Sequence, residues 1–437
     1  MTAASRGGDP PKPSARAAPD GNALARALGR WVGRGAIVED LALLSGGASK
    51  QTWSFDAVAP DGTRTGLVLR REVPGRPREP GALDREAAAL TKAYNAGLPV
   101  PELLFITDAP GIGPGGMVMR RVEGETIARR ILRDELYAAA RRVLVGQLGS
   151  FAAGLHGLNP PGNFVRPDPL PQLREQLDSF GRPSEVFELA MDWLGANPPA
   201  ERDPVLVHGD FRLGNLIVGR DGLTAVLDWE ITHLGNPAED LGWLCVKAWR
   251  FGGAAPVAGL GSRDELLAAY RAAGGADISP DELRWWEVLG TLRWGVICLT
   301  QAWAHLSGAA RSVELAAIGR RVCEQEWDLL LLLDPDAARL AAASRPRPTG
   351  AARPAPAPYG RPTASELLEA VREFLQGAVL PQTSAQLSFH ARVAANAVGI
   401  VLRELEIGPL QPDADLAGLV AARLAVANPK YFDSPPS

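Results

Sequence analysis

Two aspartates and one asparagine between Val205 and Asp240 have a spacing that suits phosphoryl transfer. Asp210 follows an apolar run and a tight His-Gly turn, Asn215 comes five residues later, and Asp228 comes thirteen residues after that. Phosphoryl transfer needs a carboxylate that orients the attacking hydroxyl and accepts its proton. It also needs hard oxygen ligands, such as a carboxylate and an amide oxygen, to hold Mg²⁺ on nucleotide phosphates. The three side chains therefore predict a phosphotransferase site.

Short strands must bring these side chains together. The run Val205–Val207 predicts a buried strand, and the turn residues 219–222 predict a β-hairpin that ends just before Asp228. A purely structural explanation is that Asp210 and Asn215 cap a turn while Asp228 ends a hairpin. That explanation suits either feature alone, but the complete set at this spacing favours chemistry.

The same segment resembles the catalytic and metal-binding loops of the aminoglycoside phosphotransferase and choline kinase-like family. The resemblance rests on the His-Gly-Asp turn, on Asn215, and on a hydrophobic strand that ends in Asp228. It implies that Asp210 is the catalytic base, that His208 braces the loop, and that Asn215 and Asp228 hold Mg²⁺. Asp240, at the start of the next helix, would support the loop from behind. ATP is the implied phosphoryl donor.

The resemblance covers roughly residues 36–335 and implies an α+β, two-lobed protein-kinase-like fold. Such a fold has an N-terminal antiparallel sheet lobe and a larger helical C-lobe. By the same resemblance, five residues of the N-lobe belong to the nucleotide site: Ser49 in a Gly-Gly loop, Arg70 on a strand, Glu86 on the following helix, and Met119 and Arg121 in the hinge.

Each of these N-lobe assignments has a qualification. Arg70 stands where kinases place a lysine, and arginine is not equivalent to lysine on phosphates. The glycines beside Ser49 also suit a plain turn, and Glu86 also suits a solvated helix face. The hinge would bond adenine through its backbone, so side chains cannot show which groups do so.

The sequences HGDFRLGN, VLDWE and GNPAEDLGWL look most like the family branch that is fused to acyl-CoA dehydrogenases in animals. In that branch arginine at position 70 is usual. The implied acceptor is a hydroxyl on a hydroxyacyl-CoA or a related acyl derivative, and Lys247 and Arg250 are candidates to bind an anionic substrate. An aminoglycoside- or choline-type kinase and a nucleotide-binding pseudokinase that acts as a scaffold remain alternatives. A protein kinase is disfavoured because Trp-Glu, not Phe-Gly, follows Asp228.

Composition divides the chain into five predicted segments. They are a disordered tail (1–20), a kinase-like N-lobe (21–122), a kinase-like C-lobe (123–340), a Pro/Ala/Arg linker (341–362) and a helical module (363–437). The linker has six prolines and no acid, so we expect no helix there and a kinase-like part that folds without the module. The module resembles a helical domain of unknown function. We expect it to dock, either as a homodimer contact or on a partner from acyl-CoA metabolism.

The overall composition is that of a globular protein. The 437 residues carry a formal net charge of −4, which does not suggest nucleic acid or an anionic membrane as a partner. No apolar run approaches the ~18 residues of a membrane span, and residues 1–20 lack the apolar core of a secretory signal. Cys245, Cys298 and Cys323 form no Cys-x-x-Cys pair, so we expect buried thiols and a cytoplasmic location.

Overall fold

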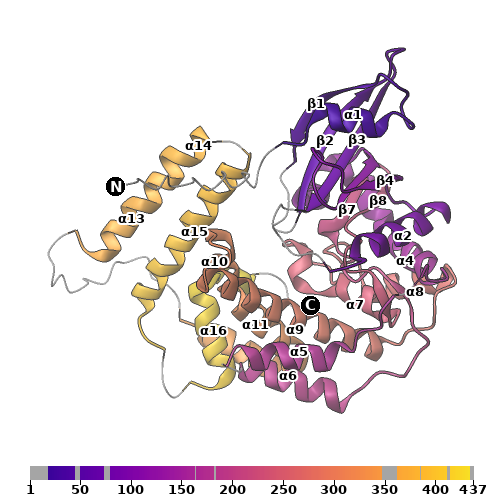
Figure 1. Cartoon of the computed structure of the whole chain (residues 1–437). Coiled ribbons are helices and arrows are strands. Elements are labelled where there is room, and N and C mark those ends of the chain that lie inside the picture. The colour runs from indigo at the N-terminus through magenta and orange to yellow at the C-terminus, as the bar shows by residue number, and fades with distance from the viewer. Residues whose placement is uncertain are drawn as a thin grey trace, which may run out of the picture. The chain divides into compact units, whose positions relative to one another are not determined.

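The computed structural model divides into two compact units, Met1–Glu123 and Gly124–Ser437 (Figure 1). It describes residues 18–44, 50–72, 79–162, 164–181, 184–346, 362–383, 385–410 and 414–433. Ser49, the predicted tail up to residue 17, and residues 347–361 of the predicted linker lie outside these ranges.

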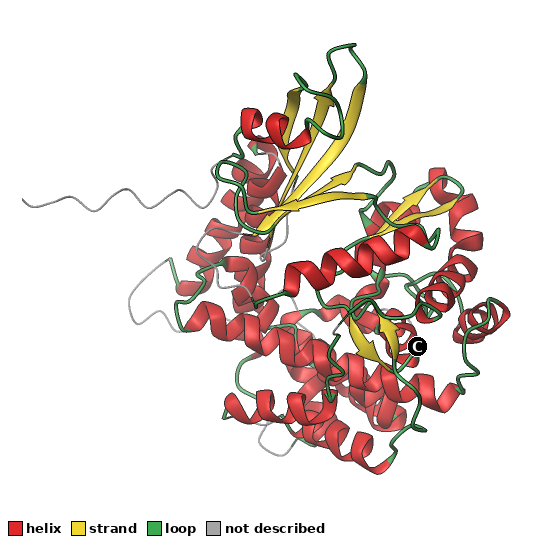
Figure 2. Ribbon diagram, turned by 45° about the vertical axis from the view of Figure 1, so that its right-hand side comes forward, coloured by secondary structure: helices red, strands yellow, loops and turns green. Residues whose placement is uncertain are grey.

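The first unit is built on an antiparallel sheet, seen as yellow arrows in Figure 2, with the strand order β1-β2-β3-β5-β4 among the described residues. Its strands are β1 (Ile37–Leu43), β2 (Lys50–Val58), β3 (Arg64–Glu72), β4 (Leu103–Thr107) and β5 (Gly116–Arg120). Along β2, buried and half-buried residues alternate strictly, which is the pattern of a strand with one face on the core. The turn at Asp61-Gly62 joins β2 to β3, as the sequence predicts.

Two helices flank this sheet in the chain. Helix α2 (Ala82–Asn95) is inserted between β3 and β4, and its buried face includes Glu86. Helix α1 (Gly21–Leu28), which the sequence analysis did not anticipate, begins at an Asp20 side-chain cap. Its Leu24 and Leu28 are fully buried in the core of the sheet, together with Phe55 of β2. The N-terminal lobe therefore includes a helix that the strand-rich pattern did not reveal.

The second unit is mostly helical and contains two small two-stranded sheets. In chain order, its elements up to residue 250 are α3 (Ala128–Arg133), η1 (Glu135–Tyr137), α4 (Ala138–His156), α5 (Pro169–Ser179), α6 (Glu185–Ala196), β6 (Val205–Val207), η2 (Leu213–Asn215), β7 (Leu216–Gly219), β8 (Gly222–Val226), β9 (His233–Gly235), α7 (Ala238–Cys245) and η3 (Lys247–Arg250). They are followed by α8 (Arg263–Ala272), α9 (Pro280–Leu306), α10 (Val313–Gly319), α11 (Val322–Leu333) and α12 (Pro335–Ser344). Strand β6 pairs with β9, and β7 pairs with β8 as the predicted hairpin.

The last part of the chain is helical, as predicted. Its elements are α13 (Ala364–Phe374), the π-helical η4 (Leu375–Val379), α14 (Leu380–Gln382), α15 (Ala385–Ile407), α16 (Leu416–Ala427) and η5 (Pro429–Asp433). Thr363 and Glu366 form a capping box at the start of α13. These helices belong to the same compact unit as α4–α12, and α16 packs on both α11 and α12.

Two expectations about the linker differ from the structure. Residues 341–344 continue helix α12, because this alanine-rich stretch precedes the first proline at position 346. The module also does not stand apart from α11, where Glu324, Glu326 and Asp328 are almost completely buried. Asn428 donates to Glu324, Tyr431 donates to Asp328, and Arg423 pairs with Glu326. Removing α16 and η5 would take these partners away, and the folding of the kinase-like part without the module remains a prediction.

The described residues contain no helix that is both long and apolar enough to cross a membrane. All three cysteines are buried and outside any disulfide, as predicted. Burial raises the pKa of both Cys298 and Cys323 to about 12, so these thiols stay protonated at neutral pH.

Candidate active site

The turn after β6 requires glycine. Gly209 has a φ of +79°, and a Cβ at this position would lie 2.8 Å from the Ile231 carbonyl oxygen. Glycine alone tolerates both the left-handed conformation and this close approach. The His-Gly-Asp sequence therefore reverses the chain at the end of a buried strand and places Asp210 directly after the turn.

Asp240 holds this turn from behind. Its carboxylate is fully buried and accepts hydrogen bonds from the backbone N–H groups of His208 (2.7 Å) and Gly209 (2.8 Å). His156 Nε2 lies 3.2 Å from the same carboxylate, and His156 Nδ1 lies 2.9 Å from the Tyr270 hydroxyl. Burial acts to raise the pKa of Asp240, but the hydrogen bond and charge of His156 outweigh it and the pKa is lowered.

The His208 ring connects the turn to the hairpin. Its Nε2 lies 3.0 Å from the Leu227 carbonyl oxygen, and its Nδ1 accepts from the Asp210 N–H at 3.2 Å. The ring packs edge-on against Trp229 at 4.9 Å between centroids. His208 is completely buried, so it acts on the loop rather than on a ligand.

The Asp210 carboxylate is oriented by side chains from three directions. Its Oδ1 accepts from Arg212 Nε (2.9 Å) and from Trp243 Nε1 (2.8 Å). Its Oδ2 accepts from Asn215 Nδ2 at 2.6 Å. The side chain remains 18% exposed, in contrast to Asp240, so a reactant can reach it.

Asn215 and Asp228 are linked through the backbone. The Leu227 N–H donates to the Asn215 carbonyl oxygen at 2.8 Å, which fixes the residue before Asp228 against the loop. Because Asn215 Nδ2 faces Asp210, its amide oxygen points elsewhere. Asp228 is half-buried and has a φ of +69°, a conformation that is uncommon for residues other than glycine. Such strained positions are frequent at functional sites.

Tryptophans and arginines form the wall beside Asp210. Trp249 packs on Trp243 at 5.2 Å and on Trp294 at 4.7 Å between ring centroids. The guanidinium of Arg212 stacks over the Trp249 ring at 4.6 Å, and that of Arg293 lies 5.1 Å from the Trp243 centroid. Trp243 and Trp249 are almost completely buried, and Arg212 and Arg293 pair with Asp210 and Glu239, so this cluster is packed core with balanced charges.

In the first unit, Glu86 binds two cations. Lys50 Nζ lies 2.7 Å from Oε2 of Glu86, and Arg70 pairs with Oε1. Glu86 is only 4% exposed, while Lys50 and Arg70 keep 11% and 14% of their side chains exposed. Arg70 and Glu86, both predicted for the nucleotide site, are therefore ion-paired, and Lys50 pairs with the same carboxylate.

The other predicted nucleotide-site residues of this unit lie in or beside the sheet. Met119 is paired with Val68 of β3, and the Arg121 N–H donates to the Gly66 carbonyl oxygen. The Arg121 guanidinium pairs with Asp56 at 2.8 Å. Ser49 lies outside the described residues, so its predicted role remains a prediction.

Comparison with known proteins places these observations in a family. Residues 40–286, more than half of the chain, match the phosphotransferase enzyme family. The chain belongs to the phosphotransferase enzyme family. Residues 381–421, which run from the end of α14 through α15 into the first half of α16, match a domain of unknown function (DUF6285).

The relatives of this family member by sequence are acyl-CoA dehydrogenase family proteins. Acyl-CoA dehydrogenase family member 11 of Gallus gallus is 35% identical over 197 residues, which are 40% of this chain and 24% of that protein. Probable acyl-CoA dehydrogenase IBR3 of Arabidopsis thaliana is 31% identical over 202 residues, which are 41% of this chain and 24% of that protein. This chain thus spans about a quarter of the length of these relatives.

A solved structure confirms the predicted fold. The crystal structure of a protein from Ralstonia eutropha, provisionally named an aminoglycoside phosphotransferase, superimposes with a TM-score of 0.55 and 22% identity. The similarity covers 70% of this chain and 96% of the other. At this identity it shows a shared fold, which is the predicted kinase-like fold with an antiparallel sheet followed by a helical part.

Two cations that the sequence suggested for substrate binding are directed into the interior of this phosphotransferase family member. Lys247 pairs with Asp328 at 3.3 Å, and its Nζ lies 4.5 Å from the centroid of the Tyr431 ring. Arg250 donates to the Cys245 carbonyl oxygen at 2.8 Å and pairs with Glu287 at 3.1 Å. Both side chains are buried, so they stabilise the fold here rather than present charge to a substrate.

Three residues that contact the predicted site residues carry no signal that was recognised in the sequence. Trp243 and Arg212 bind Asp210, and Lys50 binds Glu86. Arg212 lies within the motif itself and could have been suspected from its position two residues after Asp210. Trp243 and Lys50 act over 33 and 36 positions of sequence, and no local pattern marks such contacts.

Proposed function

We propose that this protein is a small-molecule kinase that transfers the γ-phosphoryl group of ATP to a substrate hydroxyl, and that the acceptor is a hydroxyacyl-CoA or a related acyl derivative. Asp210 is the catalytic base in this proposal. Asn215 and Asp228 hold Mg²⁺, His208 and Asp240 position the loop, and residues of the first unit bind the nucleotide.

The observation that carries the proposal is the way Asp210 is held. A carboxylate has about four lone-pair positions, and Arg212, Trp243 and Asn215 occupy three of them. One position is left for the hydroxyl of an acceptor. A proton leaving that hydroxyl then moves to an oxygen that neighbouring groups already keep in place, so little reorganisation accompanies the transfer.

The chemistry of Asn215 and Asp228 suits Mg²⁺. An amide oxygen and a carboxylate are hard ligands, and Mg²⁺ usually keeps several waters and substrate phosphates besides one or two protein ligands. Across the described ranges there is no group of three or more His, Cys, Asp or Glu side chains that could hold a metal. A two-ligand site completed by phosphate and water does not need such a group. Bound Mg²⁺ neutralises charge on the phosphates.

In the first unit, we propose that Lys50 and Arg70 contact nucleotide phosphates and that Glu86 orients both cations. Met119 and Arg121 contribute through the backbone of the hinge, as the resemblance implies, since the Arg121 side chain pairs with Asp56. Ser49 is proposed to approach the phosphates from the Gly-Gly loop. Arginine can form two parallel bonds to phosphate oxygens, so Arg70 can take the place of the usual lysine.

The choice of an acyl acceptor over an aminoglycoside rests on the resemblance to the family branch that is fused to acyl-CoA dehydrogenases. The acyl-CoA dehydrogenase relatives agree with this choice of acceptor.

The test is a screen for acceptor-dependent ADP release by the full chain with ATP and Mg²⁺. Acceptors are a series of hydroxyacyl-CoAs, choline and ethanolamine, and kanamycin. We expect turnover only with a hydroxyacyl-CoA, with the phosphate attached to its hydroxyl. Turnover with choline or kanamycin would show that the acceptor is an amino alcohol or an aminoglycoside and not a hydroxyacyl-CoA. ATP binding without turnover on any acceptor would support the pseudokinase alternative.

A calorimetric measurement tests the metal ligands separately. Asp228→Ala should abolish the Mg²⁺-dependent part of ATP binding, because it removes the charged ligand. Equal ATP affinity with and without this substitution would exclude Asp228 as a ligand.

A further inference from the structure

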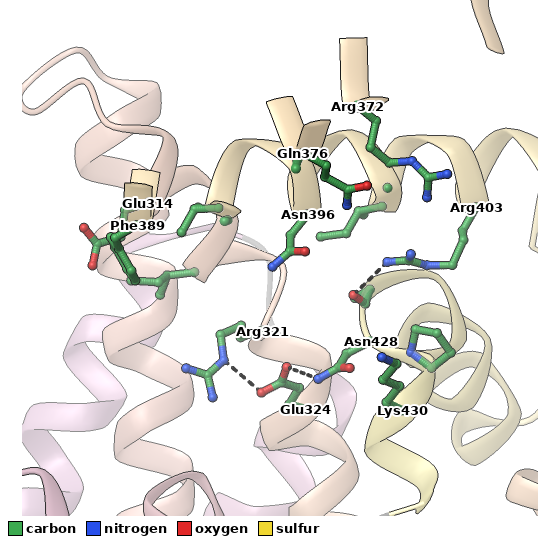
Figure 3. Close-up of a pocket in the computed structure, with 18 residues that line it drawn as sticks. Glu314, Arg321, Glu324, Arg372, Gln376, Phe389, Asn396, Arg403, Asn428 and Lys430 are labelled. Atoms are coloured by element: carbon green, nitrogen blue, oxygen red, sulfur yellow. Dashed lines mark hydrogen bonds and ion pairs between the residues drawn. The ribbon is translucent and has the colours of Figure 1, made fainter. Parts of the chain in front are cut away.

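A cavity lies among helices of the second unit, and none of the described residues that contact Asp210 lines it. Its volume is about 580 Å³, which is within the ~300–1,000 Å³ of typical small-molecule sites. Helices α10 and α11 form one side, and α13, η4, α15 and the start of η5 form the rest (Figure 3). The cavity therefore exists only where the helical module packs on the kinase-like part.

Positive charge dominates the lining of this cavity. Four cationic side chains and two acidic ones line it, and these are Arg321, Arg372, Arg403, Lys430, Glu314 and Glu324. Arg321 Nε donates to Glu324 at 2.9 Å, and Asn428 donates to the same carboxylate at 3.1 Å. The charge of Glu324 is thus balanced on its own side of the cavity.

Arg403 has carbonyl partners rather than a carboxylate. Its Nε donates to the Val426 carbonyl oxygen at 2.7 Å, and a terminal nitrogen donates to that of Ala427 at 3.3 Å. Both carbonyls belong to the last turn of α16, where the helix dipole supplies only about half a negative charge. Burial and the nearby charge of Arg372 lower the pKa of Arg403.

Arg372 leaves a donor unused at the same place. It pairs with Glu369 one turn earlier on α13, yet its Nε is buried and has no hydrogen-bond partner in the described part of the chain. Figure 3 shows Arg372 and Arg403 on one side of the cavity, with the amides of Gln376 and Asn396 near them. Guanidinium and amide N–H groups on neighbouring helices are the donors that bind an oxyanion.

The rest of the lining is apolar. Ile318 of α10 and Phe389, Val393 and Ile400 of α15 line the cavity together with the charged group. Phe389 is 43% exposed, so the apolar part opens towards solvent. A ligand that fits has a negatively charged head and a hydrocarbon tail.

We propose that this cavity binds an aliphatic carboxylate, with the carboxylate between Arg372 and Arg403 and the chain along Phe389, Val393 and Ile400. This assigns a ligand-binding role to the junction of the helical module and the kinase-like part. The inference does not depend on the proposed kinase function, because it uses none of the residues around Asp210.

Calorimetry on the full chain with sodium octanoate tests the proposal, with acetate and inorganic phosphate as head-group probes. We expect one saturable octanoate site and at least tenfold weaker binding of acetate and phosphate. Arg372→Gln should weaken octanoate binding about 10- to 100-fold, since it removes a charge-assisted hydrogen bond. Arg392→Gln removes the same charge from an exposed position on α15 and should leave binding unchanged.

A second variant separates loss of the site from loss of the fold. Gly399 lines the cavity on α15, and a Cβ there would meet Arg403 at 3.4 Å, so Gly399→Leu fills the cavity while favouring the helix. Octanoate binding should disappear with an unchanged melting temperature. Octanoate binding that survives both Arg372→Gln and Gly399→Leu, or no octanoate binding by the wild type, would overturn the proposal. Phosphate that binds as tightly as octanoate would overturn the requirement for a hydrocarbon tail.

Discussion

Two buried carboxylates, one in each unit, have opposite surroundings. Glu86 in the first unit is 4% exposed and binds the cations Lys50 and Arg70. Asp240 in the second unit is fully buried and binds two backbone N–H groups and one histidine nitrogen. Glu86 therefore fixes two cationic side chains of its own unit, whereas Asp240 fixes the path of a loop.

Burial of a carboxylate therefore does not by itself show its role in the protein. Both residues sit on a helix that follows a strand, and neither is positioned to touch a reacting atom. Because their partners differ, we expect substitution of Glu86 to change KM for ATP and substitution of Asp240 to change stability.

The largest effect on turnover should come from Asp210, the carboxylate that is held but still exposed. Asp210→Asn keeps the size of the side chain and removes its basicity, so kcat should fall by ~10²–10⁴. Acceptor-dependent ADP release measures this effect, and Asp221→Asn in the exposed hairpin turn is the matched control. Unchanged kcat would show that Asp210, like Asp240, only holds the loop.

Asp240→Asn should mainly affect stability. The amide can accept through only one oxygen, so its NH₂ group would face a backbone donor of His208 or Gly209. The free energy of unfolding should fall by about 2–4 kcal/mol, in keeping with the loss of a partner for buried hydrogen-bonding groups. Urea denaturation measures this, again with Asp221→Asn as the control. If the urea midpoint of Asp240→Asn equals that of the wild type, Asp240 does not hold the turn.

Glu86→Gln should mainly affect the nucleotide. Without the carboxylate, Lys50 and Arg70 lose their common anchor, so we expect KM for ATP to rise about tenfold while kcat changes less. Glu79→Gln, at a position that is 71% exposed, is the matched control. If Glu86→Gln leaves KM unchanged and lowers stability as Asp240→Asn does, the contrast between the two acids fails.

The smallest expected effect concerns Glu239, the neighbour of Asp240, and its partner His233. Burial opposes the charged ring, but the hydrogen bond and charge of Glu239 outweigh it and raise the pKa of His233 above 6.5. A raised pKa stabilises the fold fully below pH 6.5 and loses this contribution as the pH rises through the folded-state value. His233→Asn should therefore lower the melting temperature at pH 5.5 by an amount equivalent to ~1 kcal/mol or less, and by less at pH 8.5. If the difference in melting temperature between the wild type and His233→Asn is the same at both pH values, the His233–Glu239 ion pair does not stabilise the fold.

Local patterns predicted the elements well where contacts are short in sequence. The hairpin β7–β8 depends on residues close along the chain, whereas Arg70 and Glu86 were implied by the family resemblance. Helix α1 escaped prediction because its burial depends on a sheet that forms later in the chain. Nor does the sequence show that Lys247 points at Asp328 and Tyr431.

The helical module illustrates the same limit on a larger scale. Proline-rich composition before Thr363 predicted a boundary, and the helices after it are present. Composition cannot show that Glu324 and Asp328 of α11 take their partners from Asn428 and Tyr431, more than a hundred positions away. Packing of α16 on α11 turns an apparent separate module into part of one unit.

The His-Gly-Asp turn, Asn215 and the strand that ends in Asp228 were enough to show a resemblance to the family that the comparison confirms. Tertiary structure alone decided which groups hold these side chains and which charges are available. Trp243 reaches Asp210 only because α7 packs behind the turn, and Lys247 and Arg250 are directed inward because buried acids lie next to them. Hydrogen bonds and ion pairs depend on distance in space, which the order of residues does not contain.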